Sequence, residues 1–102
     1  MSEVNDLTSM TIIANSGDAR SFAFKALQEA KEGNYEEAEE LLVKSEISAN
    51  LAHKAQTELL FKEANGDKQE IDVLLIHSQD HLMTSMLAVE LIKEIILLYK
   101  NK

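Results

Sequence analysis

The sequence contains no cysteine and no proline, only three glycines, and aromatic residues make up 5% of its 102 positions. The absence of cysteine excludes a disulfide framework, a thiol nucleophile and any zinc site built on thiolates. Without proline, and with abundant Ala, Leu, Glu and Lys, the composition favours long uninterrupted helices over strands and tight turns. Because aromatics are few, the core must be filled by Leu, Ile, Ala and Met. We therefore predict an all-α fold.

Positive charge is also scarce in this chain. Ten Lys and Arg residues stand against eighteen Asp and Glu residues, which gives a formal net charge of −8. The balance excludes the basic surface by which proteins bind nucleic acid or anionic lipid, and it favours a basic protein partner. No apolar run reaches the roughly 18 residues of a membrane span, and the first residues lack a signal-peptide pattern. We expect a cytoplasmic protein.

Two glycine-centred segments divide the chain into three helical stretches. In "EGNYEEAEELL", Gly33 can adopt the left-handed conformation that follows a helix, and Asn34 and Glu37 have the spacing of a capping box. In "EANGDKQEI", an Asn-Gly pair ends the preceding helix, and Asp67 and Glu70 repeat the capping-box spacing. Each segment therefore predicts the end of one helix and the immediate start of the next.

The predicted organisation is a single domain over residues 1–102, with helices near residues 6–32, 35–64 and 68–100. Because the links are short, successive helices must run antiparallel, which gives an antiparallel up-down-up three-helix bundle. Gly17 lies inside the first predicted helix, where it costs about 1 kcal/mol relative to alanine. Close packing against a neighbouring helix can offset that cost.

The third predicted helix carries two apolar stripes on opposite sides. One stripe contains Val73, Ile76, Leu87, Leu91 and Leu98, and the other contains Leu82, Val89, Ile92 and Ile96. A helix of a three-helix bundle needs one apolar stripe, so the second predicts burial against another chain. Asp80 falls on the first stripe. If that stripe follows a symmetry axis, copies of Asp80 converge, and a metal ion or retained protons can relieve their repulsion. The alternative is an exposed Asp80 on a monomer.

Two histidines occur in "IHSQDHLMT", residues 76–84. His77 and His81 are four residues apart and share one helix face. Such a pair suits metal ligation, or nucleophilic catalysis in which a neutral imidazole attacks phosphorus and becomes a phosphohistidine. Two structural histidines at a packing edge are the third interpretation. The spacing alone does not decide among the three.

The segment "IHSQDHLMTSMLAVELI", with "NSGDARSFAFKAL" before it and the central "AHKAQTELL", resembles the lactose/cellobiose-type enzyme IIA of the bacterial sugar phosphotransferase system. The resemblance covers nearly the whole chain and implies a homotrimer of three-helix bundles. It implies that His77 accepts a phosphoryl group from the phosphocarrier protein HPr and passes it to a cysteine of enzyme IIB. The membrane enzyme IIC is then an indirect partner.

The resemblance also assigns roles to other residues of the motif. It implies that Asp80 meets its symmetry copies at the trimer axis and binds a divalent metal ion, usually taken as magnesium. Gln79 and His81 match the motif, and we expect Gln79 near the phosphoryl group or the subunit interface and His81 as a neighbouring donor. Ser78 stands where alanine or glycine is common in the family, so a small residue is kept.

The resemblance leaves the sugar open among β-linked disaccharides of the cellobiose, diacetylchitobiose or lactose type, and "TSMLA" favours the first two. One alternative is a helical metal-binding protein in which His77, Asp80 and His81 form one coordination sphere. Another is a tetratricopeptide-like interaction module, suggested by "ALQEAKEGNYEEAEELL". Such modules need repeats of about 34 residues, and the chain from residue 67 onward does not restate the pattern.

Overall fold

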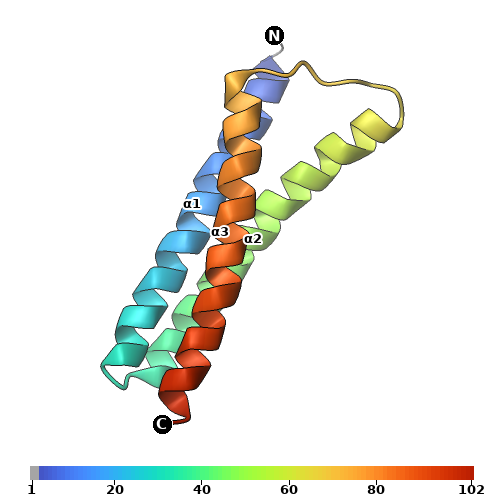
Figure 1. Ribbon diagram of the computed structural model, residues 1–102. Helices are drawn as coiled ribbons and strands as arrows, with labels where there is room; N and C mark the ends of the chain where they lie inside the picture. The colour runs from blue at the N-terminus through green and yellow to red at the C-terminus, as the bar shows by residue number, and fades with distance from the viewer. Residues whose placement is uncertain (1–2) are drawn as a thin grey trace.

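The computed structural model describes residues 3–102, which form three α-helices: α1 (Glu3–Lys31), α2 (Tyr35–Ala64) and α3 (Val73–Lys100). No strand occurs in this part of the chain, so the all-α prediction is confirmed. α2 runs antiparallel to α1, and α3 returns parallel to α1 in the predicted up-down-up order (Figure 1). None of the helices within residues 3–102 is both long and apolar enough to cross a membrane.

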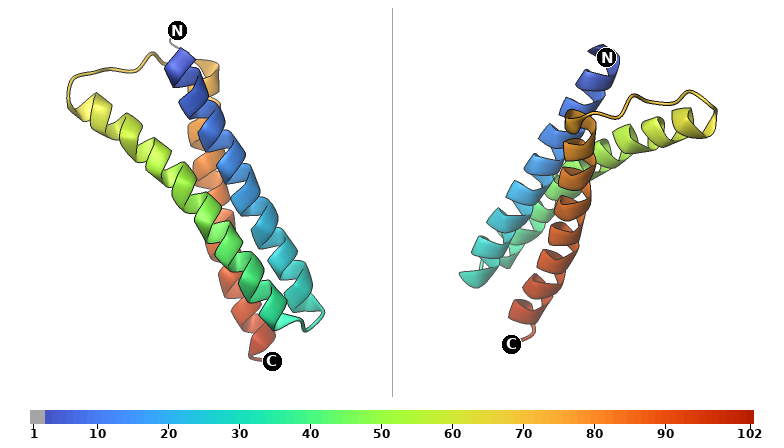
Figure 2. Two further views of the ribbon diagram at one scale, coloured as in Figure 1. Left: turned by 180° about the vertical axis from the view of Figure 1, so that it is seen from behind. Right: turned by 45° about the horizontal axis from the view of Figure 1, so that its top comes forward.

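The three helices do not stay together over their full length. α1 and α3 lie side by side, whereas the C-terminal half of α2 diverges from α3 and ends well away from it (Figures 1 and 2). The segment 65–72 then crosses the gap to reach the start of α3. The N-terminal part of α3 therefore has α1 along one side and a widening separation from α2 on the other.

The turn between α1 and α2 is built as the sequence predicts, except for its cap. Gly33 has φ +82°, and the N–H of Asn34 donates to the carbonyl of Glu29 at 2.9 Å, a pattern that ends helices. α2 begins at Tyr35 as expected. The predicted capping box of Asn34 with Glu37 is wrong, because the Asn34 side chain makes no cap hydrogen bond to the first turn of α2. Its amide donates to the Glu29 carboxylate at 2.9 Å, a hydrogen bond to an ionised group that ties Asn34 to the end of α1.

The start of α3 differs from the prediction. Gly66, with φ +88°, ends α2 as expected, but α3 begins at Val73 and not near residue 68. The N–H of Asp67 is used at the end of α2, where it donates to the carbonyl of Lys62 at 2.9 Å. Because α2 has diverged, the residues after Asp67 must bridge back to α1 before a helix can pack there. The predicted cap formed by Asp67 and Glu70 is therefore wrong.

The residue that caps α3 is Asp72. Its backbone is extended, with φ −138° and ψ 176°, and its carboxylate accepts a hydrogen bond from the N–H of Leu75 at 2.8 Å. This satisfies one of the N–H groups that have no partner in the first turn of a helix.

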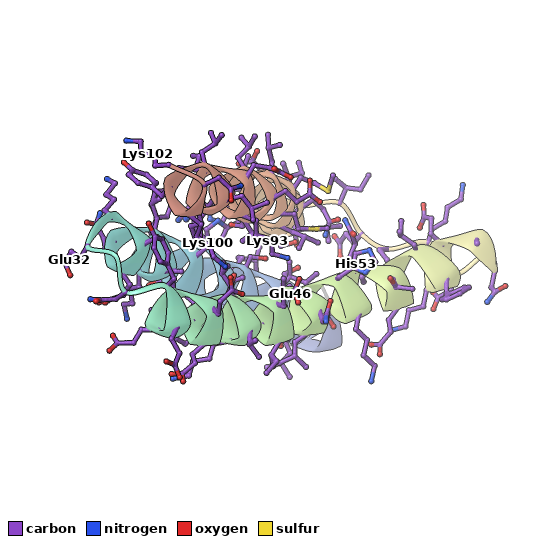
Figure 3. All side chains as sticks on the ribbon, turned by 90° about the horizontal axis from the view of Figure 1, so that it is seen from below. Glu32, Glu46, His53, Lys93, Lys100 and Lys102 are labelled. Atoms are coloured by element: carbon purple, nitrogen blue, oxygen red, sulfur yellow. The ribbon has the colours of Figure 1, made fainter. Side chains whose placement is uncertain are left out.

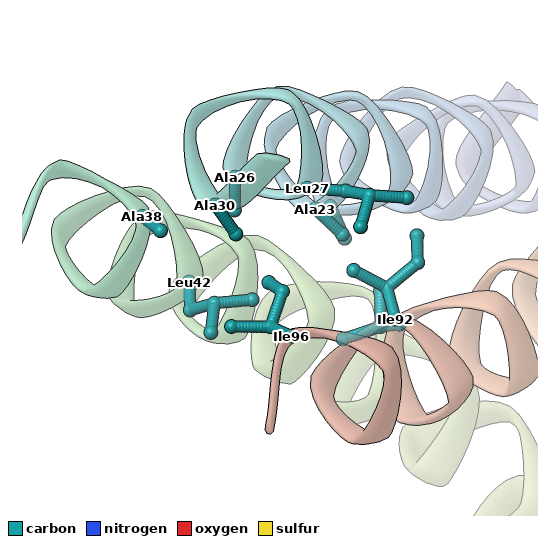
Figure 4. Packing of buried hydrophobic residues seen from close by; sticks show 10 residues of the cluster. Ala23, Ala26, Leu27, Ala30, Ala38, Leu42, Ile92 and Ile96 are labelled. Atoms are coloured by element: carbon teal, nitrogen blue, oxygen red, sulfur yellow. The ribbon is translucent and has the colours of Figure 1, made fainter. Parts of the chain in front are cut away.

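The core consists of two clusters at different levels of the bundle. The larger cluster joins all three helices near the α1–α2 turn, and its small residues let the helices approach closely (Figure 4). It contains Ala19, Ala23, Ala26, Leu27, Ala30, Ala38, Leu42, Val89, Ile92 and Ile96. The smaller cluster contains Ile12, Ala52, Leu59 and Leu82, and it lies beside the polar motif of α3.

Polar contacts tie the lower half of α2 to its neighbours. The Ser45 hydroxyl donates to the carbonyl of Ala19 at 2.7 Å, and both residues are buried. Lys93 of α3 forms an ion pair with Glu46 of α2 (Figure 3). The N-terminal half of α2 is thus fixed to both other helices.

The two apolar stripes of α3 have different surroundings, as their positions predict. Leu82, Val89, Ile92 and Ile96 are buried in the protomer. The opposite stripe is exposed: Val73 is 81% exposed, Leu98 is 70% exposed, and Ile76, Leu87 and Leu91 are all more than half exposed. A single protomer therefore leaves one face of α3 unpacked.

Candidate functional site

The polar motif of residues 76–84 lies in the N-terminal part of α3, at the level where α2 diverges. His77, the fifth residue of α3, is exposed. Among the described residues its ring has no hydrogen-bonding partner, and it stacks on a second imidazole. An exposed imidazole on a rigid helix is accessible to a protein partner, which is the first requirement of a phosphoryl acceptor.

The neighbouring imidazole is that of His81. The two ring centroids are 5.7 Å apart and the planes are 19° from parallel, so the rings stack. Nitrogen lone pairs lie in the ring planes, and nearly parallel rings therefore do not point them at one shared ion. No group of three or more His, Cys, Asp or Glu residues suited to a metal ion occurs within residues 3–102 of the protomer. The coordination sphere of His77, Asp80 and His81 is not favoured.

His81 is half-buried and faces α1. A Cβ atom placed on Gly17 would lie 3.5 Å from its Nε2 atom, so the ring rests directly on the α1 backbone. Burial lowers the pKa of His81 from the ordinary value, and the charges of Arg20 and then His77 lower it further, against the opposing effect of Asp80. The environment thus favours the neutral imidazole, since burial next to a cation disfavours a second positive charge.

Gln79 points to a different neighbour, α2. Its side-chain carbonyl accepts a hydrogen bond from Nε2 of Gln56 at 2.7 Å, and its own Nε2 donates to the Ser78 hydroxyl at 3.3 Å. Ser78 is fully buried and donates to the carbonyl of Leu75 at 2.6 Å, which explains why a small residue is needed there. Sequence reasoning missed Gln56. No sequence pattern of α2 singles Gln56 out, because its partner lies on another helix.

Asp80 lies on the exposed apolar stripe. Its carboxylate accepts no hydrogen bond from the described residues, and the exposed side chains of Ile76, Met83 and Leu87 flank it along the helix. A carboxylate in such a setting is fully hydrated in a lone protomer. It would lose that hydration if the stripe packed against another copy of α3.

The residues of the motif therefore have different surroundings. His77 and His81 stack together at the α1 side, Gln79 contacts α2, and Asp80 lies on the exposed stripe. Arg20 is the only arginine of the chain, so few positive charges are available to stabilise a phosphoryl group permanently. This suits a carrier, because a phosphoramidate held too tightly would not react with the next acceptor.

Comparisons with known proteins agree with one another. The family model of the PTS system lactose/cellobiose-specific IIA subunit matches residues 7–100. The lactose-specific EIIA component of Streptococcus mutans is 50% identical over 95 residues, which are 93% of this chain and 91% of that protein. The crystal structure of the cellobiose-specific enzyme IIA from Bacillus anthracis has a TM-score of 0.94 and 50% identity, covering 99% of this chain and 93% of the other.

Solution structures of the IIA(Chitobiose)–HPr complex of the Escherichia coli phosphotransferase system also match. Their TM-score is 0.82 at 42% identity, and the match covers 99% of this chain and 97% of the other.

Proposed function

Because this chain belongs to the lactose/cellobiose-specific IIA family of the phosphotransferase system, we propose that His77 carries a phosphoryl group from HPr to a cysteine of enzyme IIB. The chain is a phosphotransferase component of sugar transport. The observation that supports His77 is its position: it is the exposed member of the histidine pair, on a rigid helix, with no hydrogen bond to restrain its nitrogens. The complex of a relative with HPr supports the donor.

The proposed reaction consists of two displacements at phosphorus. A ring nitrogen of His77 attacks the phosphorus held by HPr, the bond from phosphorus to HPr breaks, and its electron pair stays on HPr. A cysteine thiolate of IIB then attacks the same phosphorus. The P–N bond to His77 breaks, and its electron pair restores the neutral imidazole. Both steps need in-line approach and modest charge neutralisation, and an exposed ring permits both.

Replacing each histidine separately tests this assignment. Incubation with phosphoenolpyruvate, enzyme I and HPr should add one acid-labile, base-stable phosphate to the wild-type protein, and His77→Gln should abolish it. His53→Gln is the matched control, because His53 is exposed on α2 and does not belong to the motif, so this variant should remain fully phosphorylated. Labelling that survives in His77→Gln would reject His77 as the carrier.

The proposal includes assembly as a homotrimer through the exposed stripe of α3. Burying a Leu or Val side chain contributes roughly 1.5–3 kcal/mol, and the stripe offers several such side chains in one line. Contiguous exposed apolar surface of this kind marks protein interfaces. Each protomer has a formal charge of −8, so the protomers repel one another electrostatically. An apolar contact face keeps most of this charge away from the interface.

Asp80 fits a divalent cation only in such an assembly. One protomer supplies a single carboxylate at this position, whereas converging copies supply oxygen ligands of the kind that Mg²⁺ accepts. In the assembled protein, the converging Asp80 carboxylates would therefore hold the ion. Its positive charge would offset the repulsion among them. The ion is not assigned a part in phosphoryl transfer.

Two substitutions on the stripe test the assembly. Asp80→Leu should remain trimeric in sedimentation and lose bound metal, because it replaces like charges with apolar contacts. Leu87→Glu should dissociate the protein, since it places three new carboxylates in the same interface. A monomeric wild-type protein at micromolar concentration would refute the proposed trimer.

The sugar is proposed to be a β-linked disaccharide of the cellobiose, diacetylchitobiose or lactose type, taken up by enzyme IIC. A cytoplasmic location is part of the same proposal. Phosphoryl transfer from the loaded protein to purified IIB proteins of each sugar system would identify the branch, and the productive partner should accept phosphate at least about tenfold faster than the others, a difference of about 1.4 kcal/mol.

A further inference from the structure

We propose that Gly17 of α1 is a positioning residue for the histidine pair: it leaves the space in which the His81 ring rests, and His81 in turn orients the ring of His77. The inference rests on the proposed role of His77. It adds a residue of another helix, outside the polar motif, to the support of the phosphoryl acceptor.

The backbone does not require glycine at this position. The glycines with positive φ are Gly33 and Gly66, and Gly17 lies in the middle of α1 with ordinary helical geometry. A glycine in a helix interior is about 1 kcal/mol less favourable than alanine. What the site requires at this position is therefore a side chain no larger than a methyl group.

That space is occupied by His81. A Cβ atom on Gly17 would meet the His81 Nε2 atom at 3.5 Å, an ordinary contact distance, so alanine fits while any longer side chain enters the place of the ring. The positions beside this contact are also small: Ser16 and Ser85 are each 1% exposed, and their hydroxyls have no partner. Small buried residues on both helices thus keep α1 and α3 close together beside the ring.

Because the two rings stack, the position of the His81 ring affects the orientation of the His77 ring. The rings are 5.7 Å apart and 19° from parallel, and the stack with His81 is the contact that restricts rotation of the exposed His77 ring. A displaced His81 would free that rotation or block part of its range. Misplacement of a reacting group by about 1 Å can cost about 100-fold in rate.

The test compares Gly17→Ala with Gly17→Leu, each in the wild-type and in the His81→Ala background. Gly17→Ala should keep the wild-type rate of phosphorylation by HPr and should raise the urea midpoint. Gly17→Leu should lower the rate about 10- to 100-fold. In the His81→Ala background Gly17→Leu should cause no further loss, because the ring that it displaces is absent.

A second readout does not depend on phosphate transfer. Long-range ¹H–¹⁵N spectra of the imidazoles should show altered His77 signals in Gly17→Leu and unaltered signals in Gly17→Ala, while His53 stays constant in both. Unchanged His77 signals in Gly17→Leu overturn the inference, whatever the phosphorylation assay shows. So does an equal loss of rate in both backgrounds, which would mean that the leucine acts on the fold and not through His81. If Gly17→Leu does not fold, the shorter Gly17→Val is measured in the same way.

Discussion

Replacing Asp72 with alanine removes the side chain that caps the first turn of α3. Its carboxylate accepts a 2.8 Å hydrogen bond from the N–H of Leu75 in a half-buried setting, and the first turn has no acidic residue to substitute for it. Loss of such a cap typically costs about 1 kcal/mol, within a range of about 0.5–2. For a domain of this size that corresponds to a drop of about 4–8 °C in Tm.

The measurement is urea unfolding followed by circular dichroism at a fixed protein concentration, because association would make the midpoint depend on concentration. Hydrogen exchange supplies a local readout. In Asp72→Ala the amides of the first turn of α3 should exchange faster, and the fraying should approach His77, the fifth residue of the helix.

Asp67→Ala is the matched control for this prediction. Asp67 is the cap that the sequence pattern predicts, but in the structure its N–H closes the end of α2 and its side chain caps nothing. Its replacement should change stability by less than about 0.5 kcal/mol. Asp72→Ser should retain most of the stability, since serine also caps helices. If Asp67→Ala cost as much as Asp72→Ala, the assignment of the α3 boundary would be refuted.

Five further substitutions test the two glycine turns and two hydrogen bonds between helices. Gly33→Ala and Gly66→Ala should each destabilise the protein by roughly 1–2 kcal/mol in urea unfolding, because φ is +82° and +88° there; wild-type stability in both would contradict the turn geometry. A double-mutant cycle of Gln56→Ala and Gln79→Ala should give a coupling free energy of about 1 kcal/mol, and strict additivity would exclude their hydrogen bond. Tyr35→Phe should cost about 1 kcal/mol, since the hydroxyl donates at 3.0 Å to a backbone carbonyl in the last turn of α3; an unchanged midpoint would argue against that contact.

Helix number and the ends of α1 and α2 could be predicted because their signals are local. Gly33 and Gly66 both adopt positive φ, which glycine tolerates better than other residues, so the pattern and the backbone agree. The two stripes of α3 could also be predicted, because 100° per residue fixes which side chains share a face. Their exposures in the protomer follow that arithmetic.

The caps could not be predicted because they depend on tertiary arrangement. Asn34 has the right spacing for a cap, but its side chain makes no cap hydrogen bond and instead contacts the carboxylate of Glu29 across the turn. Asp67 has the right spacing too, yet the divergence of α2 delays α3 until Val73. A capping pattern describes a few consecutive residues and carries no information on where the next helix finds a partner.

The residues of the motif could be identified from sequence, but not what each one contacts. The contacts of Gln79 with Gln56 and of His81 with Gly17 join helices that are distant in the sequence. A residue such as Gln56, in a helix of ordinary composition, becomes conspicuous only once its partner is known. Periodicity predicts on which face of its helix a side chain lies. Its contact partner can be identified only when the packing of the helices is known.

The distribution of side-chain size explains why α3 has two apolar faces. The core of the protomer contains many alanines and buried serines, while many of the larger aliphatic side chains of α3, among them Leu87, Leu91 and Leu98, are exposed. Apolar stabilisation grows with the area removed from water, at about 25 cal/mol per Å². Each small residue of the core therefore contributes little apolar stabilisation. Larger apolar side chains, which would contribute more if they were buried, lie on the outer face of α3. Small domains bury a limited share of their surface, so this outer face offers apolar burial that the protomer alone does not achieve. Assembly through α3 would thus stabilise the fold and enclose Asp80 in the same step.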